Sequence, residues 1–309
     1  MEFEKFTKTF KEALEKELEG TGIDLTEKDM AKPNHSYHAL LASTDEQGLT
    51  IDVERAFSRY QRGSSIEELC INAKDSINDA FNRGKFLKFA KELFNDYDKA
   101  KAYLTTEIVS IERNSEYLET VPYTKISEDL AEIYRIILSS NEDSTSSAVV
   151  SDAMLKKFGI TVEQLRRDAL KNAMEKETPV VDGILGLLKS MGADQETIKN
   201  ASSPFLVASV SGKNHGAKVL GYPGFLESTA ERLDNSFWII PSSIHEVLIL
   251  PEGMPAVTPQ DLQEMIKQVN DTEVDEEDIL SYKLYHYDMG SQLLETADTY
   301  RNRTVSECI

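Results

Sequence analysis

The sequence predicts an α+β fold: an antiparallel or mixed sheet packed with helices, in two coupled halves. Helically spaced apolar residues fill most of the first 100 positions, whereas strand-sized apolar runs lie close together between residues 204 and 250. Few segments follow the strand–helix–strand order of a doubly wound sheet. With 40% apolar and 28% charged residues, the 309-residue chain has the composition of a globular protein with a hydrophobic core.

The first helix and the first hairpin are indicated by two different periods. Apolar side chains recur at helical spacing from Phe3 to Leu18, and Gly20 follows as a stop signal. Segments 38–42 and 48–53 flank a polar turn, which is typical of a β-hairpin. We therefore expect a helix followed by two paired strands.

Further helices and one strand complete the first half. A short helix is expected over residues 53–60, and Ser65 with Glu68 forms a capping-box pattern at the start of the next one. Residues 84–100 continue with helical spacing. The alternating, β-branched residues 103–112 predict a strand.

The second half starts with an ambiguous apolar segment. Residues 130–138 predict a strand, with a helix as the open alternative. A polar loop is then expected over 139–147, a short strand over 148–150, and helices over 152–159 and 161–174.

The last third is the richest in strands. A flexible glycine-containing stretch is expected from Pro179 to Gly192, and a frayed polar tail after residue 296. Between them we expect a strand over 204–210, a helix over 216–233 interrupted by Pro223, paired strands over 237–240 and 246–250, a helix over 258–269 and a strand over 282–287.

The seam between the two halves is predicted between residues 113 and 125, where Val121 and Pro122 mark a turn. This division gives an N-terminal α+β subdomain over 1–120, a C-terminal α+β subdomain over 121–296 and a polar tail over 297–309.

The net charge of −20 narrows the classes of partner. Nucleic acids and anionic membranes attract Lys and Arg, so this balance argues against binding to either. A more specific alternative is that the acidic surface mimics DNA and occupies a DNA-binding protein. The acidic residues are interleaved with Lys and Arg along the chain, however, which favours a solvated surface.

Cytoplasmic localisation is expected from three further features. The start of the chain is acidic and amphipathic, unlike a signal peptide. No apolar run approaches the ~20 residues needed to span a bilayer. The two cysteines, Cys70 and Cys308, are far apart and suggest neither a disulfide framework nor a metal cage.

Several familiar chemistries are absent from the sequence. Residues 211–214 contain Gly-Lys, but Val207 stands where a phosphate-binding loop needs its first glycine. No dinucleotide-binding or nucleophile-elbow motif occurs. The five histidines lack zinc-site spacing, and the acidic segment 270–278 lacks the central glycine of a calcium loop. We expect no metal and no cofactor.

One short segment concentrates reactive side chains. Ser242, Ser243, His245 and Glu246 lie at the junction of two apolar strands, with Trp238 close in sequence. A small hydrolase would use Ser243 as nucleophile and His245 as base, and Ser242 and Trp238 could contact a ligand. The alternative is a tight turn whose polar side chains satisfy backbone groups, because neighbours along a strand point to opposite faces.

A second candidate precedes a predicted helix. Asn214, His215 and Gly216 could hold an anion on free backbone N–H groups. An ordinary helix start explains the same residues.

At these residues the chain resembles a bacterial family. The runs Gly216-Ala-Lys-Val-Leu-Gly-Tyr-Pro-Gly-Phe-Leu-Glu and Phe237-Trp-Ile-Ile-Pro-Ser-Ser-Ile-His-Glu-Val-Leu-Ile-Leu-Pro are similar to a family catalogued only as a domain of unknown function, common in Gram-positive gut bacteria. Segment 239–250 has a fainter similarity to YtpQ-like cytosolic proteins. The resemblance covers most of the chain and carries no activity, cofactor or catalytic residue with it.

Three functional hypotheses follow. The first is a non-catalytic intracellular protein that binds a protein partner. The second is the small hydrolase at Ser243, His245 and Glu246. The third is the acidic decoy for a DNA-binding protein.

Overall fold

The computed structural model describes the chain except for residues 45–47, 83, 141–144, 184–203, 255–256 and 308–309. The chain divides into two compact units, Met1–Glu92 (unit 1) and Leu93–Ile309 (unit 2). Three antiparallel sheets combine with many helices, so the predicted α+β class is confirmed. Most of the glycine-containing stretch and Cys308 lie outside the described residues.

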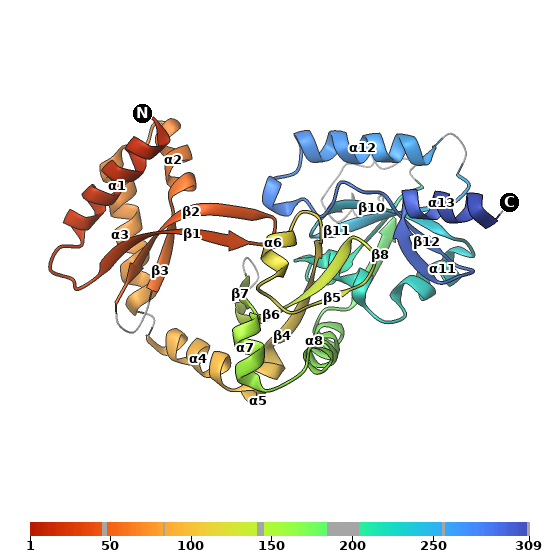
Figure 1. The fold of residues 1–309 in the computed structure, drawn as a ribbon, viewed down its shortest axis with the longest axis horizontal. Coiled ribbons are helices and arrows are strands. Elements are labelled where there is room, and N and C mark those ends of the chain that lie inside the picture. Colours follow the sequence, from red (N-terminus) through yellow and green to blue (C-terminus); the bar gives the residue numbers. More distant parts are fainter. Residues whose placement is uncertain (45–47, 83, 141–144, 184–203, 255–256, 308–309) are drawn as a thin grey trace, which may run out of the picture. The chain divides into compact units, whose positions relative to one another are not determined.

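Unit 1 is a three-stranded sheet covered by helices (Figure 1). Its elements are α1 (Phe3–Glu17), β1 (Asp24–Lys32), β2 (His35–Ser43), β3 (Gly48–Asp52), α2 (Val53–Gln61), α3 (Ile66–Asn82) and α4 (Gly84–Asn95), whose last residues belong to unit 2. Phe6, Phe10 and Leu14 of α1 pack in one core with Leu40 of β2. The helical spacing of these apolar residues places them on one face of α1, which is the face that becomes buried.

Short-range signals fix the starts of two helices in unit 1. The Asp52 carboxylate accepts the Arg55 N–H at 2.8 Å at the start of α2. The Ser65 hydroxyl accepts the Glu68 N–H at 3.1 Å before α3, as the capping pattern predicts. Strand β1 was not predicted, because this edge strand is polar and mostly exposed, although it pairs with β2 along its whole length.

Unit 2 contains the other two sheets, and its elements follow in chain order. They are α5 (Tyr97–Ala100), η1 (Lys101–Tyr103), β4 (Leu104–Ser110), α6 (Ser115–Leu118), β5 (Tyr123–Lys125), β6 (Leu130–Ser140), β7 (Thr145–Val149), α7 (Asp152–Phe158), α8 (Val162–Lys176), β8 (Pro179–Gly183), β9 (Leu206–Val210), η2 (Gly216–Gly221), α11 (Phe225–Leu233), β10 (Phe237–Ser243), β11 (Glu246–Pro251), α12 (Pro259–Thr272), η3 (Glu276–Asp278), β12 (Tyr285–Asp288), β13 (Leu293–Thr296) and α13 (Ala297–Glu307).

The two sheets of unit 2 share one hydrophobic core. The six-stranded sheet has the order β13-β12-β10-β11-β9-β8, with α12 packed on one face and α11 on the other. In the four-stranded sheet, β6 is flanked by β4 on one side and by β5 and β7 on the other. Ile108 of β4 and Leu130 of β6 join the same core as Ile239 of β10.

Four expectations about unit 2 need correction. The loop expected over 139–147 is partly strand, because β6 extends to Ser140 and β7 begins at Thr145. Residues 179–183 form strand β8 by pairing with β9. The helix expected over 216–233 is a 3₁₀ segment and a separate helix, divided around Pro223. The tail expected to be frayed forms α13, whose Arg303 side chain donates to Asp288 of β12.

Other expectations are confirmed. Residues 130–138 are strand rather than helix, and β10 pairs with β11 as predicted. The helix expected over 258–269 is α12, and Thr258 and Asp261 form a reciprocal capping box at its start.

The predicted boundary at residue 120 stays a prediction. It falls between β4 and β5, two strands of one sheet. No helix among the described residues has the length and apolar character needed to cross a membrane.

Strand β4 is the edge of its sheet, and this position shapes the site described below. Helix α8 and segment η2 both pack against β4. At the start of η2, a Cβ added to Gly216 would clash with the Ser209 hydroxyl and the His245 carbonyl. Only glycine allows η2 to approach this closely.

Candidate functional site

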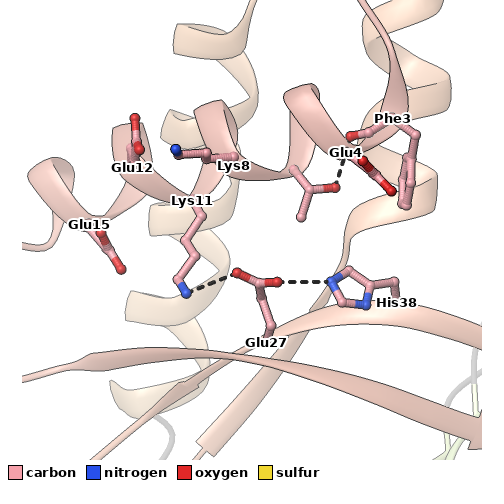
Figure 2. A pocket seen from close by; sticks show the side chains of 9 residues that line it. Phe3, Glu4, Lys8, Lys11, Glu12, Glu15, Glu27 and His38 are labelled. Carbon is pink, nitrogen blue, oxygen red and sulfur yellow. Dashed lines mark hydrogen bonds and ion pairs between the residues drawn. The ribbon is translucent and has the colours of Figure 1, made fainter.

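Unit 1 contains an open groove between α1 and the sheet. Its volume is about 730 Å³, and its lining includes Lys8, Glu12 and His38. Figure 2 shows the Glu27 carboxylate between two basic groups, 3.0 Å from Lys11 Nζ and 3.6 Å from His38 Nε2. These charged groups are partly exposed and pair with one another, so the groove offers a mixed-sign surface rather than a built site.

A smaller cavity of about 350 Å³ lies in unit 2 at the start of β4. It is formed by β4, β6, β7, α8 and the loop before η2, and we call it the β4 pocket. Its lining residues are Tyr103, Leu104, Thr105, Thr106, Arg135, Ile137, Ser140, Thr145, Ser147, Asn172, Ala173, Lys176, Glu177, Gly212, Asn214, His215 and Lys218.

The described lining of the β4 pocket carries an excess of positive charge. The lining includes Arg135, Lys176, Lys218 and His215, and one carboxylate, that of Glu177, which pairs with Lys218. Lys218 is only 3% exposed, and its ammonium donates to Glu177 Oε2 at 2.8 Å and to Thr105 Oγ1 at 3.3 Å. A buried ammonium needs such partners because desolvation disfavours its charged form.

Glu107 of β4 lies behind this lining and is almost fully buried. Its Oε2 accepts from Arg135 Nη1 at 2.6 Å, and its Oε1 lies 3.2 Å from His215 Nδ1. Burial alone would raise the pKa of Glu107, but the pairing with His215 and Arg135 outweighs it and lowers that pKa to about 2. The carboxylate therefore stays ionised and orients both basic groups.

A second histidine continues this arrangement. The backbone N–H of His215 donates to His245 Nδ1 at 3.2 Å, and the two ring centroids are 5.6 Å apart. His245 Nε2 lies 3.4 Å from Asp278 Oδ1. Because Nδ1 accepts a hydrogen bond, the ring proton lies on Nε2 beside the carboxylate. His215 itself has a left-handed backbone with φ of +48°, a conformation that non-glycine residues seldom adopt.

Thr106 contributes an unusual polar atom to the pocket. The residue is fully buried, and its hydroxyl has no hydrogen-bond partner among the described residues. A buried hydroxyl without a partner costs about 1–3 kcal/mol.

The structure separates the residues that the sequence singled out. Asn214 and His215 line the β4 pocket, and Gly216 is buried directly behind them. Trp238 belongs to a different region, where its ring packs 4.6 Å from that of His286. His245 connects to the pocket only through His215.

The serine–histidine corner has a geometry of its own. The Ser243 hydroxyl accepts the backbone N–H of His245 at 3.0 Å, and the His245 ring nitrogens face the His215 N–H and Asp278. Ser242, in β10, and Glu246, the first residue of β11, are half-buried on either side of the turn. This arrangement resembles the tight turn more than a nucleophile beside its base, and the hydrolase hypothesis stays a prediction.

The charged residues of the site were not predicted. Glu107 and Arg135 are 28 positions apart in the sequence and lie in two different strands. Glu177, at the end of α8, and Lys218, in η2, come from two further segments. Charged residues within the predicted strands 103–112 and 130–138 could have indicated the site, because a charged side chain is seldom buried without a partner of opposite charge. Among the described residues, no three His, Cys, Asp or Glu side chains converge as metal ligands would.

Comparison with known proteins gives one finding. A family model described as a family of unknown function (DUF5688) matches residues 3–289, so the chain belongs to that family. No curated protein and no solved structure matches the chain.

Proposed function

We propose that this member of the DUF5688 family is a non-catalytic binding protein whose β4 pocket holds a small anionic ligand. The observation that carries the proposal is the net positive charge of the pocket lining. Arg135, Lys176 and Lys218 carry three positive charges against two carboxylates, Glu177 in the described lining and Glu107 behind it, in a chain whose net charge is −20. A local excess of positive charge against that background favours an anion.

The burial of the basic groups supports the same conclusion. Lys218 and Arg135 are held in place by Glu177 and Glu107, so their donors are oriented before any ligand arrives. Pre-organised donors lose little conformational entropy on binding. The volume of about 350 Å³ is near the lower end of the ~300–1,000 Å³ typical of small-molecule sites.

Binding, rather than chemistry, is the better match to the groups present. The cations and their carboxylates form paired networks, and the pocket lining contains no cysteine. We retain the hydrolase at Ser243, His245 and Glu246 as the alternative, and it requires a rearrangement that brings a serine hydroxyl to the His245 ring.

We also propose a bacterial, cytoplasmic setting, on the resemblance to a Gram-positive gut family and to YtpQ-like proteins. The acidic composition, with a sequence pI near 4.7, is compatible with a cytosolic protein. A protein partner remains part of the proposal. The acidic decoy is less favoured, because exposed acidic groups such as Glu17 and Asp271 pair with lysines.

The proposal is tested by nuclear magnetic resonance titration of the full chain with inorganic phosphate and with gluconate. We expect at least one anion to give saturable shifts at the Asn214–Lys218 amides, and Lys218→Met to weaken that binding about tenfold or more. Lys267→Met is the matched control, because Lys267 is an exposed ion-paired lysine outside the pocket. Equal binding by all three proteins, or no saturable shift with either anion, would contradict the proposal.

A further inference from the structure

We infer that the ligand of the β4 pocket is a phosphate monoester of a small polyol, as in a sugar phosphate. This inference rests on the proposed anion-binding function and adds the chemical class. It is carried by two properties of the described pocket lining: the directions from which its cations come and the hydroxyl and amide side chains among its other residues.

The cationic groups reach the pocket from three different elements. Arg135 comes from β6, Lys176 from the end of α8 and Lys218 from η2. A planar carboxylate presents two oxygens in one plane, whereas a phosphate monoester presents three terminal oxygens in a tetrahedral arrangement. Donors that approach from three elements are better matched to the phosphate.

Arg135 is suited to this role by the way it is already held. Its Nε donates to the Ser147 hydroxyl at 2.8 Å and its Nη1 to Glu107 at 2.6 Å. These two bonds occupy Nε and Nη1 and fix the plane of the guanidinium, so Nη2 is the nitrogen left to donate to a ligand oxygen. Lysine has no planar group that could be held in this way.

His215 supplies a further donor. Glu107 faces His215 Nδ1, so the other ring nitrogen, Nε2, is the one left for a ligand oxygen.

The rest of the wall indicates what the phosphate is attached to. Hydroxyl and amide side chains outnumber the apolar ones, and they include Thr145, Ser147, Asn172 and Asn214. Such groups exchange hydrogen bonds with the hydroxyls of a polyol. An aryl or alkyl ester would instead leave these polar side chains without partners.

A matched ligand panel separates the parts of this inference. The ligands are glucose 6-phosphate, gluconate, glucose and phenyl phosphate, titrated calorimetrically into the full-length chain. Gluconate keeps the polyol but replaces phosphate with carboxylate, and phenyl phosphate keeps the phosphate but removes the polyol. We expect glucose 6-phosphate to bind about tenfold or more tightly than each of the other three.

A pair of arginine variants tests the geometric basis. Arg135→Lys keeps the charge and loses the planar guanidinium that Ser147 and Glu107 hold in place, so the preference for glucose 6-phosphate over gluconate should fall severalfold. Arg166→Lys is the control, because Arg166 also pairs with a buried glutamate of the same sheet, Glu132, but does not line the pocket. Its preference should equal that of the wild type.

The outcomes distinguish the inference from the proposed function. Gluconate binding as tightly as glucose 6-phosphate would overturn the phosphate and leave the anion pocket intact. Tighter binding of phenyl phosphate would overturn the polyol. Binding by none of the anions would overturn both the inference and the proposed function.

Discussion

Two charged side chains inside apolar strands define the site at the scale of single residues. Glu107 and Arg135 lie on directly neighbouring strands, β4 and β6, and the glutamate is buried between arginine and His215. Isolated burial of such a carboxylate would cost many kcal/mol, so its partners are part of the fold as well as of the pocket.

Removal of the Glu107 charge should destabilise the protein. Glu107→Gln leaves Arg135 without its buried partner, and we expect a loss of about 3 kcal/mol in the free energy of unfolding, measured by urea denaturation. Glu116→Gln, an exposed change in the same unit, should have little effect. Equal stability of the two variants would contradict the role assigned to the Glu107 pair.

The lowered pKa of Glu107 gives the same prediction a pH dependence. A carboxyl whose folded pKa lies below its ordinary value of 4.5 stabilises the protein fully above that value. The stabilisation is lost as the pH falls from about 4.5 toward 2. The unfolding free energy of Glu107→Gln should therefore approach that of the wild type across this window, and a constant difference would contradict the account.

Thr106 tests the cost of a buried hydroxyl without a partner. Thr106→Val removes such a hydroxyl within the described chain, so we expect a gain of up to about 1 kcal/mol in the free energy of unfolding. In Thr229→Val the lost hydroxyl bonds the Phe225 carbonyl at 2.8 Å, so that variant should lose stability. Thermal unfolding checks both. A loss of stability in Thr106→Val as large as that in Thr229→Val would contradict this explanation.

At this scale the sequence predicted part of the candidate site. Asn214 and His215 were singled out because they precede a predicted helix, whose first backbone N–H groups are free, and this signal lies within one short segment of sequence. Glu107, Arg135 and Lys218 were missed, because their meeting depends on strand register and on the approach of η2, which no short segment encodes. The approach of η2 itself rests on the absence of a side chain at Gly216.

At the scale of elements, helix α13 shows how a polar segment is held in place. Its Arg303 donates to Glu295 at 2.6 Å and to Asp288 at 2.8 Å, which lowers the pKa of Asp288 to about 2. The Tyr300 ring stacks on the buried His286 ring, with centroids 3.7 Å apart. A single apolar stripe would have predicted this helix, but the anchors are charged and aromatic groups whose partners come from β12 and β13.

His286 should make this anchor sensitive to acid. Burial lowers its pKa from the ordinary 6.5, only partly opposed by attraction to Glu252. Stability is then complete above pH 6.5 and falls as the pH decreases below it, because the unfolded histidine takes up a proton more readily. His286→Phe should abolish this part of the loss between pH 7 and 5, at up to about 1.4 kcal/mol per pH unit.

The matched control is His35→Phe in unit 1, because His35 is partly exposed. Melting temperatures measured across the pH range test the pair. A wild-type-like pH profile in His286→Phe would contradict the account of the α13 anchor.

Elements with strong local signals were the ones predicted correctly. Helix α1 has a continuous apolar stripe. Helix α12 begins with Thr258 at the N-cap and Pro259 in the first turn, which is a typical helix start. Strands β1 and β8 were missed, because each is stabilised by its partner strand more than by its own composition.

At the scale of the whole molecule, each hydrophobic cluster of the described residues lies within one of the two compact units. Every described residue that lines the β4 pocket lies in unit 2. The overall class followed from periodicity, whereas the division near residue 92 falls inside a continuous helix, α4, where composition gives no boundary signal.

Loss of the unit 1 core should therefore leave ligand binding intact. Phe6→Ala removes a fully buried ring, which typically costs about 3–5 kcal/mol, and we expect one calorimetric unfolding transition to move to lower temperature. Affinity for glucose 6-phosphate should stay within about twofold of the wild type. A parallel loss of affinity at temperatures where unit 2 remains folded would contradict the independence of the two units.

Hydrogen–deuterium exchange of the full-length chain, with and without glucose 6-phosphate, tests whether the β4 pocket is the ligand-binding site. We expect slower exchange at the amides of residues 103–107 and 214–218, which flank the β4 pocket, and no change over residues 3–43. Protection confined to the unit 1 groove, or unchanged exchange at the β4 pocket under conditions of saturating ligand, would contradict it.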